Sequence, residues 1–248
     1  MIDHAVDARD HWTAARKSLR AKEKELTRWR DKINAERRAL PWVRIDKAYL
    51  FDTPRGKCTL ADLFGGKSQL IIKHFMLAPG REEGCGGRSF ELDHVGGAFR
   101  HFRRHDVAFA SVARAPIAEI EAYRKRMGWH FPFVSSYGSD FNYDFHVSFT
   151  SDEVAEGQGY CNCETTDVGI GDLSGLSVFY RSPEGEIFHT YSTFGRGGEE
   201  VLCACMLLDM TPKGRDETGL HHNPADCAMS QDRYALDDPA PCCRPIRK

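Results

Sequence analysis

The sequence predicts an α/β fold in which a central sheet is flanked by helices, with a long N-terminal helix before it and an irregular tail after it. Residues 70–75 form a short apolar run of the kind found in a buried strand. After Cys85 the large apolar residues recur at close to a helical period. The same order repeats with a strand at 107–112 and a helix at 117–127. Alternation of strand and helix is typical of βαβ units and favours a mostly parallel sheet.

Length and composition narrow the classes of protein that this chain can belong to. The 248 residues suffice for one large domain with extensions, and the net charge of −2 gives no general reason to bind nucleic acid or acidic lipid. The segment Met1–Trp12 carries three aspartates and lacks the apolar core of a secretory signal. No apolar run approaches the roughly 20 residues that span a bilayer. We therefore expect a cytoplasmic protein with no nucleic-acid or membrane partner, whose nine cysteines are mostly reduced.

Residues 1–40 are predicted to be a helical arm. Apolar residues recur there every seven positions, namely Trp12, Leu19, Leu26, Ile33 and Leu40. Residues 9–38 also hold eleven Lys or Arg against five Asp or Glu. We interpret this as a solvated basic face whose apolar stripe packs on the domain or on a second copy, which would make a homodimer. The alternative is a basic patch for an anionic partner. Pro41 should end the helix.

Residues 41–210 are predicted to be the main domain and 211–248 an irregular tail. The domain's other expected elements are a strand at 48–51, a capped short helix after Thr59, an extended segment at 131–134, a long loop at 151–175, a hairpin at 176–191 and a closing helix at 199–210. The tail is rich in Pro, Asp and Gly and has no apolar period, so it is not expected to form a core.

Cys85 stands between a buried strand and the start of a helix. Free N–H groups and the helix dipole favour a thiolate at that point. Arg88, one turn further on, would add positive charge, whereas Glu82 and Glu83 would oppose it. Cys85 is therefore a candidate nucleophile. The alternative is a loop cysteine without chemistry in a protein that uses its fold for binding.

Several motifs along the chain resemble a thioredoxin-like family known as domain of unknown function 899, described as predicted dithiol-disulfide oxidoreductases. The matching stretches are Leu40-Pro41-Trp42-Val43, Thr59-Leu60-Ala61-Asp62-Leu63-Phe64, His74-Phe75-Met76, Arg114-Ala115-Pro116, Arg126-Met127-Gly128-Trp129, residues 135–145, residues 188–192 and residues 208–215. The resemblance covers about residues 5–217 and implies a thioredoxin-like fold with a central mixed sheet.

The resemblance also implies a Cys-x-x-Cys redox motif. Cys85 matches its first cysteine and Ser89 the serine that follows it, but Arg88 replaces the second cysteine. We therefore predict Cys85, Arg88 and Ser89 as catalytic residues of a thiol-disulfide oxidoreductase that works through a single nucleophilic cysteine, without a cofactor, on a protein or small-molecule disulfide or thiol. The thiol that resolves the product would be external or one of five other cysteines, namely Cys58, Cys161, Cys163, Cys203 and Cys205.

A second hypothesis is a non-catalytic binding protein on the same scaffold, with a Cys/His site for copper or zinc. In an extended loop, Cys161 and Cys163 would share one face, as two ligands of one metal should. The tail adds further soft ligands, namely His221, His222, Cys227, Cys242 and Cys243. The aromatic residues of 141–146 would either line a pocket beside Cys85 or form a packed turn.

Overall fold

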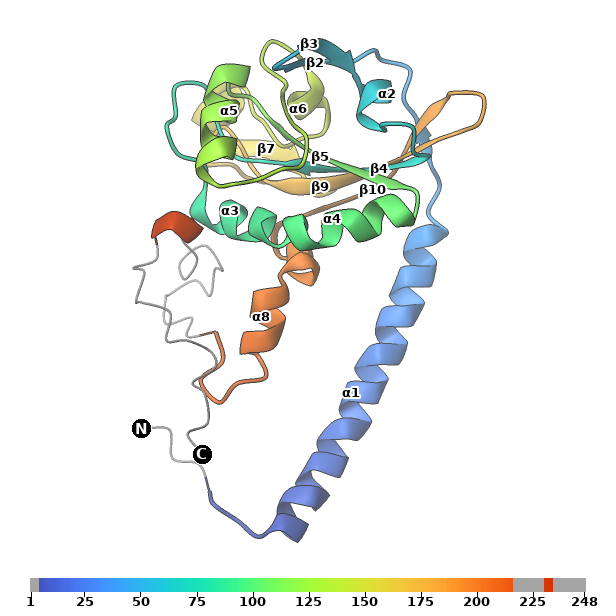
Figure 1. The fold of residues 1–248 in the computed structure, drawn as a ribbon, viewed down its shortest axis with the longest axis vertical. Coiled ribbons are helices and arrows are strands. Elements are labelled where there is room, and N and C mark those ends of the chain that lie inside the picture. The colour runs from blue at the N-terminus through green and yellow to red at the C-terminus, as the bar shows by residue number, and fades with distance from the viewer. Residues whose placement is uncertain (1–4, 216–229, 234–248) are drawn as a thin grey trace, which may run out of the picture. The chain divides into compact units, whose positions relative to one another are not determined.

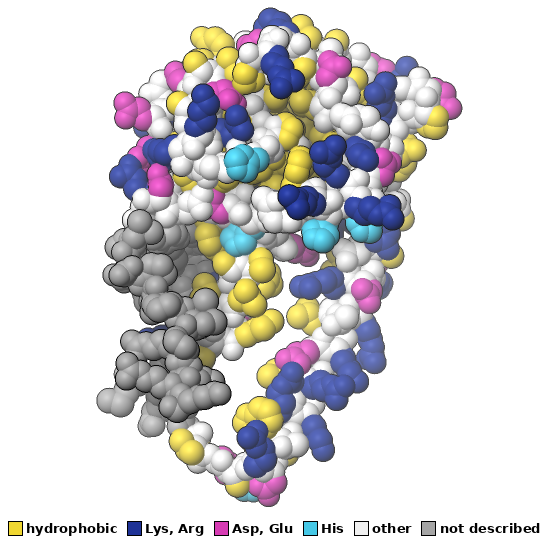
Figure 2. All heavy atoms as spheres, viewed as in Figure 1, with side chains coloured by type: hydrophobic (Ala, Val, Ile, Leu, Met, Phe, Trp, Pro, Cys, Tyr) yellow, Lys and Arg dark blue, Asp and Glu magenta, His cyan; other side chains and the backbone are white. Residues whose placement is uncertain are grey.

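The computed structural model describes residues 5–215 and 230–233 (Figure 1). The chain divides into two compact units, Met1–Trp42 and Val43–Lys248. The first consists mainly of helix α1, Arg9–Arg38, which confirms the predicted long helix. The helix ends shortly before Pro41, as the restricted backbone before a proline requires. Figure 2 shows apolar and basic side chains interspersed along α1, and none of its residues is buried.

The apolar stripe of α1 leads to a first prediction. Large apolar residues in a repeating row should be covered by the domain or by a second copy of the chain. Leu19→Asp combined with Leu26→Asp should therefore lower the melting temperature or reduce the mass in solution, measured by calorimetry and sedimentation. Ala14→Asp with Ala21→Asp adds the same charge on another face of the helix and should change neither. If the two double variants behave alike, the stripe has no partner.

The second unit is built on an eight-stranded sheet with the order β1-β10-β9-β4-β5-β6-β2-β3. Its strands are β1 Val43–Arg44, β2 Leu50–Thr53, β3 Gly56–Thr59, β4 Gln69–His74, β5 Val107–Ala113, β6 Phe133–Ser135, β9 Gly175–Arg181 and β10 Ile187–Phe194. The central strand β4 pairs in parallel with β5, from Gln69 opposite Val107 to His74 opposite Val112. On its other side β4 pairs antiparallel with β9, which pairs antiparallel with β10.

This arrangement is the thioredoxin-like topology. The chain leaves β4, passes through the helices α3, Gly86–Asp93, and α4, Val95–Arg104, and returns in β5 beside β4. The hairpin β9–β10 completes the sheet on the opposite side. The mostly parallel sheet expected from strand and helix alternation is wrong, because among the strands that the structure describes only β4–β5 and β5–β6 pair in parallel. Hairpins need only short turns, so β2–β3 and β9–β10 add antiparallel strands on both sides.

Two apolar cores lie on the two faces of this sheet, because alternate residues of each strand point in opposite directions. One core joins β4 and β5 to the short helices α2, Leu60–Leu63, and α6, Phe141–Asp144. The other joins the sheet to α3, α4 and α5, Ile117–Arg126. Figure 1 shows α3 and α4 running along the sheet, with α2 and α6 on its other side.

Helix caps explain several boundaries. The predicted short helix α2 begins with a capping box, in which the Thr59 side chain accepts from the Asp62 N–H and the Asp62 carboxylate accepts from the Thr59 N–H. The expected long loop at 151–175 is wrong. It contains α7, Ser151–Glu156, which has a capping box between Thr150 and Glu153 and ends at Gly157 in the left-handed conformation.

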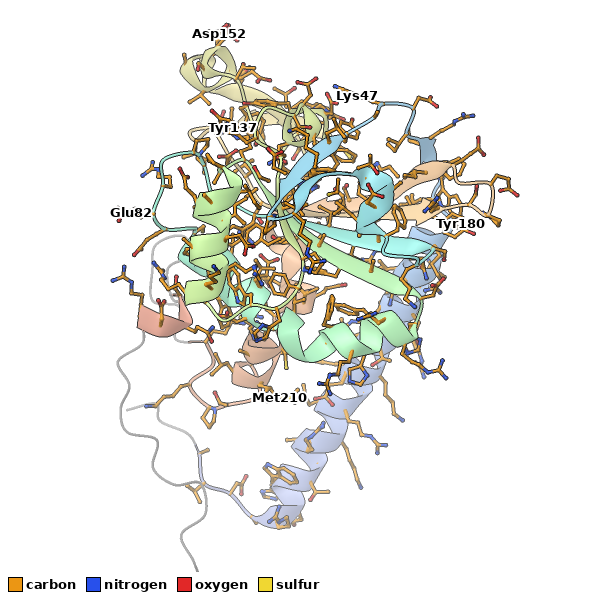
Figure 3. All side chains as sticks on the ribbon, turned by 45° about the horizontal axis from the view of Figure 1, so that its top comes forward. Lys47, Glu82, Tyr137, Asp152, Tyr180 and Met210 are labelled. Atoms are coloured by element: carbon orange, nitrogen blue, oxygen red, sulfur yellow. The ribbon has the colours of Figure 1, made fainter. Side chains whose placement is uncertain are left out.

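After α7 the chain forms a separate two-stranded hairpin of β7, Gln158–Cys161, and β8, Glu164–Asp167. Its turn residues Asn162 and Cys163 both have positive φ, 52° and 67°, as a tight hairpin turn requires. Figure 3 shows α7, marked by Asp152, at the periphery of the domain.

The closing helix is shorter than predicted. Residues Gly195–Val201 form a 3-10 helix, and only Cys203–Leu208, α8, is an α-helix. In the tail, a second 3-10 turn at Gln231–Arg233 meets the end of α5, where the Gln231 side chain donates to the Met127 carbonyl at 2.7 Å. Among the described helices, none combines the length and the apolar character that crossing a membrane requires.

Candidate functional site

Cys85 occupies the N-terminal cap of α3, which confirms that a helix starts at this cysteine. Its N–H donates to the Met76 carbonyl at 3.2 Å, and its carbonyl accepts from the N–H of Ser89 at 2.9 Å. No side chain among the described residues caps this helix. The first N–H groups of a helix have no partner within the helix, so they remain available to a charged sulfur.

The loop that delivers Cys85 is packed tightly against the second core. A Cβ atom on Gly84 would lie 2.4 Å from the Phe75 ring, closer than any real contact. The Phe75 ring is itself held by the rings of Tyr123, Trp129 and Phe133, with centroids 5.4 to 5.9 Å away. Only glycine therefore lets the backbone before Cys85 approach the core so closely.

Three charged side chains form a linked group near the start of α3. Lys73 on β4 and Glu91 on α3 are only 3% and 2% exposed, and their Nζ and Oε2 atoms are 2.6 Å apart. The guanidinium of Arg88 also donates to Glu91 Oε2, at 3.2 Å. Burial lowers the pKa of Lys73, while attraction to Glu91 and to the nearby Cys85 sulfur opposes that shift. Two positive groups thus share one carboxylate near the start of α3.

The acidic residues that precede Cys85 are partly neutralised. Glu83 pairs with Arg126 at 3.5 Å and also with Arg233. Figure 3 shows Glu82 pointing outward from the loop that leads to α3. At least one of the two glutamates expected to oppose a thiolate is therefore held by other partners.

Ser89, the third predicted site residue, is fully buried. Its hydroxyl donates to the Cys85 carbonyl at 2.9 Å and lies 2.7 Å from the Tyr123 hydroxyl. These bonds tie the first turn of α3 to α5. Ser89 therefore bonds to the backbone of Cys85, whereas Arg88 reaches the space in front of it.

That space is a cleft of about 350 Å³. On one side it is lined by Met76, Cys85 and Arg88, and on the other by residues of the β7–β8 hairpin and of two neighbouring segments, namely Cys161, Asn162, Glu164, Thr166, Ile170, Leu173, Ser174, Phe194 and Gly195. The lining is largely apolar, with one cationic group beside the cysteine. Its size suits a small molecule or a side chain of a protein substrate.

The aromatic residues of 141–146 do not form this cleft. Phe141 and Phe145 are buried in the first core with Tyr49 and Phe179, so the packed-turn interpretation is correct. His74 is also buried, 2.8 Å from the Ser177 hydroxyl, and burial lowers its pKa to about 3, which keeps it neutral.

The expected arrangement of Cys161 and Cys163 for a metal is wrong. The tight turn separates them, because Cys161 is buried and Cys163 is exposed. Within residues 5–215 and 230–233, no three His, Cys, Asp or Glu side chains converge to hold a metal ion. His221, His222, Cys227, Cys242 and Cys243 lie outside the described residues.

Sequence reasoning missed Lys73 and Glu91. A usable signal existed, because a lysine inside an apolar strand is rarely buried unless it is paired. The sequence pattern did not indicate which residue pairs with Lys73, because Glu91 lies on another element. The place of Cys161 in the cleft depends on the β7–β8 hairpin, in a stretch for which the sequence predicts a loop.

Some solved structures are similar to part of this chain. A cysteine-to-serine mutant of PrxQ from Xylella fastidiosa shares 16% identity and covers 64% of this chain and 88% of its own, with a TM-score of 0.39. A cysteine-to-serine mutant of peroxiredoxin Q from Xanthomonas campestris shares 15%, covers 64% and 90%, and has a TM-score of 0.40. Peroxidoxin BcpB from Mycobacterium tuberculosis shares 9%, covers 66% and 94%, and also has a TM-score of 0.40.

No curated protein matches the sequence. The model of one family, described as "Bacterial protein of unknown function (DUF899)", matches residues 1–234. The match spans the arm, the sheet with its helices and the cleft, and it agrees with the resemblance seen in the sequence motifs. The chain belongs to this DUF899 family.

Proposed function

We propose that this protein is a thiol-dependent oxidoreductase in which Cys85 attacks a small disulfide or hydroperoxide bound in the cleft. The observation that carries the proposal is the position of Cys85, at the uncapped start of α3 and facing an open cleft beside Arg88. A thiolate is the reactive form of cysteine, and helix N–H groups and a guanidinium both stabilise it.

The expected step differs little between the two substrate classes. The Cys85 thiolate attacks one atom of the S–S or O–O bond, and that bond breaks as the new bond to sulfur forms. A disulfide yields a mixed disulfide and releases a thiolate. A hydroperoxide yields the Cys85 sulfenic acid and an alcohol or water, once the leaving oxygen has taken up a proton.

Arg88 and Lys73 have different roles in this proposal. Arg88 lines the cleft and would contact the substrate or the leaving group. Lys73 is buried and paired with Glu91, and its positive charge would favour a thiolate at the nearby Cys85. Glu91 acts as a positioning residue, since its carboxylate holds both cations.

The test measures the reactivity of individual thiols and the consumption of substrate. At neutral pH, Cys85 should react with iodoacetamide at least about ten times faster than the exposed Cys163 and Cys203. Peptide mapping measures the rate at each cysteine. With dithiothreitol as reductant, the protein should consume a small disulfide or a hydroperoxide faster than dithiothreitol alone does, and Cys85→Ser should abolish this excess rate.

Two variants serve as controls. Arg88→Ala should slow alkylation of Cys85 several-fold, whereas Arg88→Lys, which keeps the charge, should slow it less. The proposed function is wrong if Cys85 and Cys163 are alkylated at equal rates and the consumption of substrate survives Cys85→Ser.

A further inference from the structure

The cleft is lined by a second thiol. Cys85 reaches it from the start of α3, and Cys161 reaches it from the end of β7. The other cysteines of the described residues, namely Cys58, Cys163, Cys203 and Cys205, do not line this cleft. Among the described cysteines, Cys161 is therefore the one positioned to react with an adduct formed on Cys85.

We propose that Cys161 is the resolving thiol, which takes over the oxidised Cys85 in an intramolecular disulfide. This inference rests on the proposed function of Cys85. Cys161 would act as the second cysteine of a Cys-x-x-Cys pair does, because Arg88 occupies that cysteine's position in this chain.

The step is balanced for both substrate classes. When Cys85 carries a sulfenic acid, the Cys161 thiol attacks its sulfur, the S–O bond breaks, and one water leaves with the thiol proton. When Cys85 carries a mixed disulfide, the same attack releases the second half of the substrate as a thiol. A small dithiol such as dithiothreitol then reduces the Cys85–Cys161 bridge and is itself oxidised to a disulfide.

The surroundings of the two thiols separate their roles. Cys161 is 4% exposed and packs in a small cluster with Phe149 and Val168. Burial raises the pKa of the Cys161 thiol, which keeps it protonated and slow toward an external oxidant. Cys85, at a helix N-terminus and beside Arg88, is the thiol that reacts first.

The pleat of β7 directs Cys161 toward the domain. Gly159 and Cys161 are buried while Gln158 and Tyr160 are exposed, as alternation along a strand requires. A Cβ atom on Gly159 would lie 2.7 Å from the Phe149 ring, so this face of the hairpin is in close contact with the domain. The Cys161 side chain therefore faces inward.

A disulfide requires the two Cα atoms to come within about 4.4–6.8 Å, so the bridge would form through any movement of the hairpin that brings Cys161 this close to Cys85. Its construction suits such a movement, because β7 and β8 pair with each other in a sheet separate from the main one. Among the described strands, none of the main sheet pairs with the hairpin, so the movement has to open only the apolar contacts of Cys161 with Phe149 and Val168.

The segments before α7 and after the hairpin, in contrast, are firmly attached to the domain. The Arg114 guanidinium donates to both carboxylate oxygens of Asp172, at 2.6 and 2.9 Å. The Ser148 hydroxyl donates to Asp172 at 2.6 Å, and the Leu173 N–H donates to the Val147 carbonyl at 2.7 Å. These bonds fix where the segment that carries α7 and the hairpin leaves and rejoins the domain, so a movement of the hairpin would keep Cys161 near the cleft.

The experiment oxidises the full chain with one equivalent of hydrogen peroxide or of a small disulfide, blocks free thiols, and maps peptides without reduction. We expect a Cys85–Cys161 bridge in the parent protein. Cys161→Ala should remove the bridge and leave Cys85 as a sulfenic acid that dimedone traps. It should also make Cys85 about tenfold or more prone to overoxidation by excess peroxide, because nothing withdraws the sulfenic acid.

Cys163→Ala is the matched control, since it removes an exposed thiol two residues away on the same hairpin. It should form the bridge like the parent. The melting temperatures of Cys161→Ser and Cys161→Ala show whether either variant has unfolded, since unfolding by itself would also remove the bridge.

The outcomes separate this inference from the proposed function. Oxidation of Cys85 without a bridge to Cys161, or with a bridge to any other cysteine, overturns the inference and leaves the proposed function intact. If no variant shows oxidation at Cys85, the proposed function fails and the inference fails with it.

Discussion

Glu91→Gln should lower the free energy of unfolding by about 3–5 kcal/mol, the loss expected when one partner of a buried ion pair is removed. Glutamine has nearly the same volume as glutamate, so the change creates no cavity. It removes the negative charge between two cations, Lys73 at 2.6 Å and Arg88 at 3.2 Å. The Lys73 ammonium, only 3% exposed, would then be buried without a counter-charge. Denaturant unfolding of the parent and the variant measures the difference.

A double variant distinguishes charge from packing. Lys73→Met in the Glu91→Gln background removes the uncompensated charge and keeps an unbranched side chain in the strand. We expect it to recover at least half of the lost stability, because replacing a buried ion pair by groups of similar volume is often close to neutral. A Glu91→Gln variant within about 1 kcal/mol of the parent would contradict a tightly coupled pair.

Gly84→Ala should lower both stability and the reactivity of Cys85. The added Cβ would lie 2.4 and 2.5 Å from two atoms of the Phe75 ring and 3.3 Å from Tyr123. The Phe75 ring cannot turn aside easily, because it is enclosed by other aromatic rings. Overpacking of this kind destabilises by about 1–3 kcal/mol. The chain can otherwise move the loop that holds Cys85, and a shift of about 1 Å can slow a reaction by tenfold or more.

Gly97→Ala is the control for this substitution. Gly97 lies within α4, and nothing lies within 4 Å of its added Cβ. Alanine there should raise stability by about 0.4–1 kcal/mol, because it reduces the freedom of the unfolded chain. Cys85 should react at the parent rate. Equal effects of the two alanines on Cys85 alkylation would show that the contact with Phe75 does not position the thiol.

Much of the fold was predictable because its signals are local. The period of apolar residues defined α1, and the apolar run at 70–75 defined β4. The capping pattern that begins at Thr59 located α2. Each of these signals lies within a few residues of the element that it specifies, where propensity and periodicity act directly.

The errors came from short elements among polar residues. The capping box of Thr150 and Glu153 starts α7, but the helix is only six residues long and has no apolar period to reveal it. The turn of the β7–β8 hairpin uses Asn162 and Cys163 at positive φ, where Asn-Gly is the usual sequence. These residues therefore looked like a loop.

Residues close together in the sequence predict that Cys85 begins a helix after a buried strand and that Arg88 follows it by one turn, and the family motifs predict the thioredoxin-like fold. What surrounds that cysteine depends on the tertiary structure. It brings Lys73 from β4 against Glu91 from α3, and it places Cys161, from a hairpin far along the chain, on the same cleft. Such contacts depend on how strands are ordered and how loops close, and no local pattern of residues encodes the distance between elements far apart in the chain.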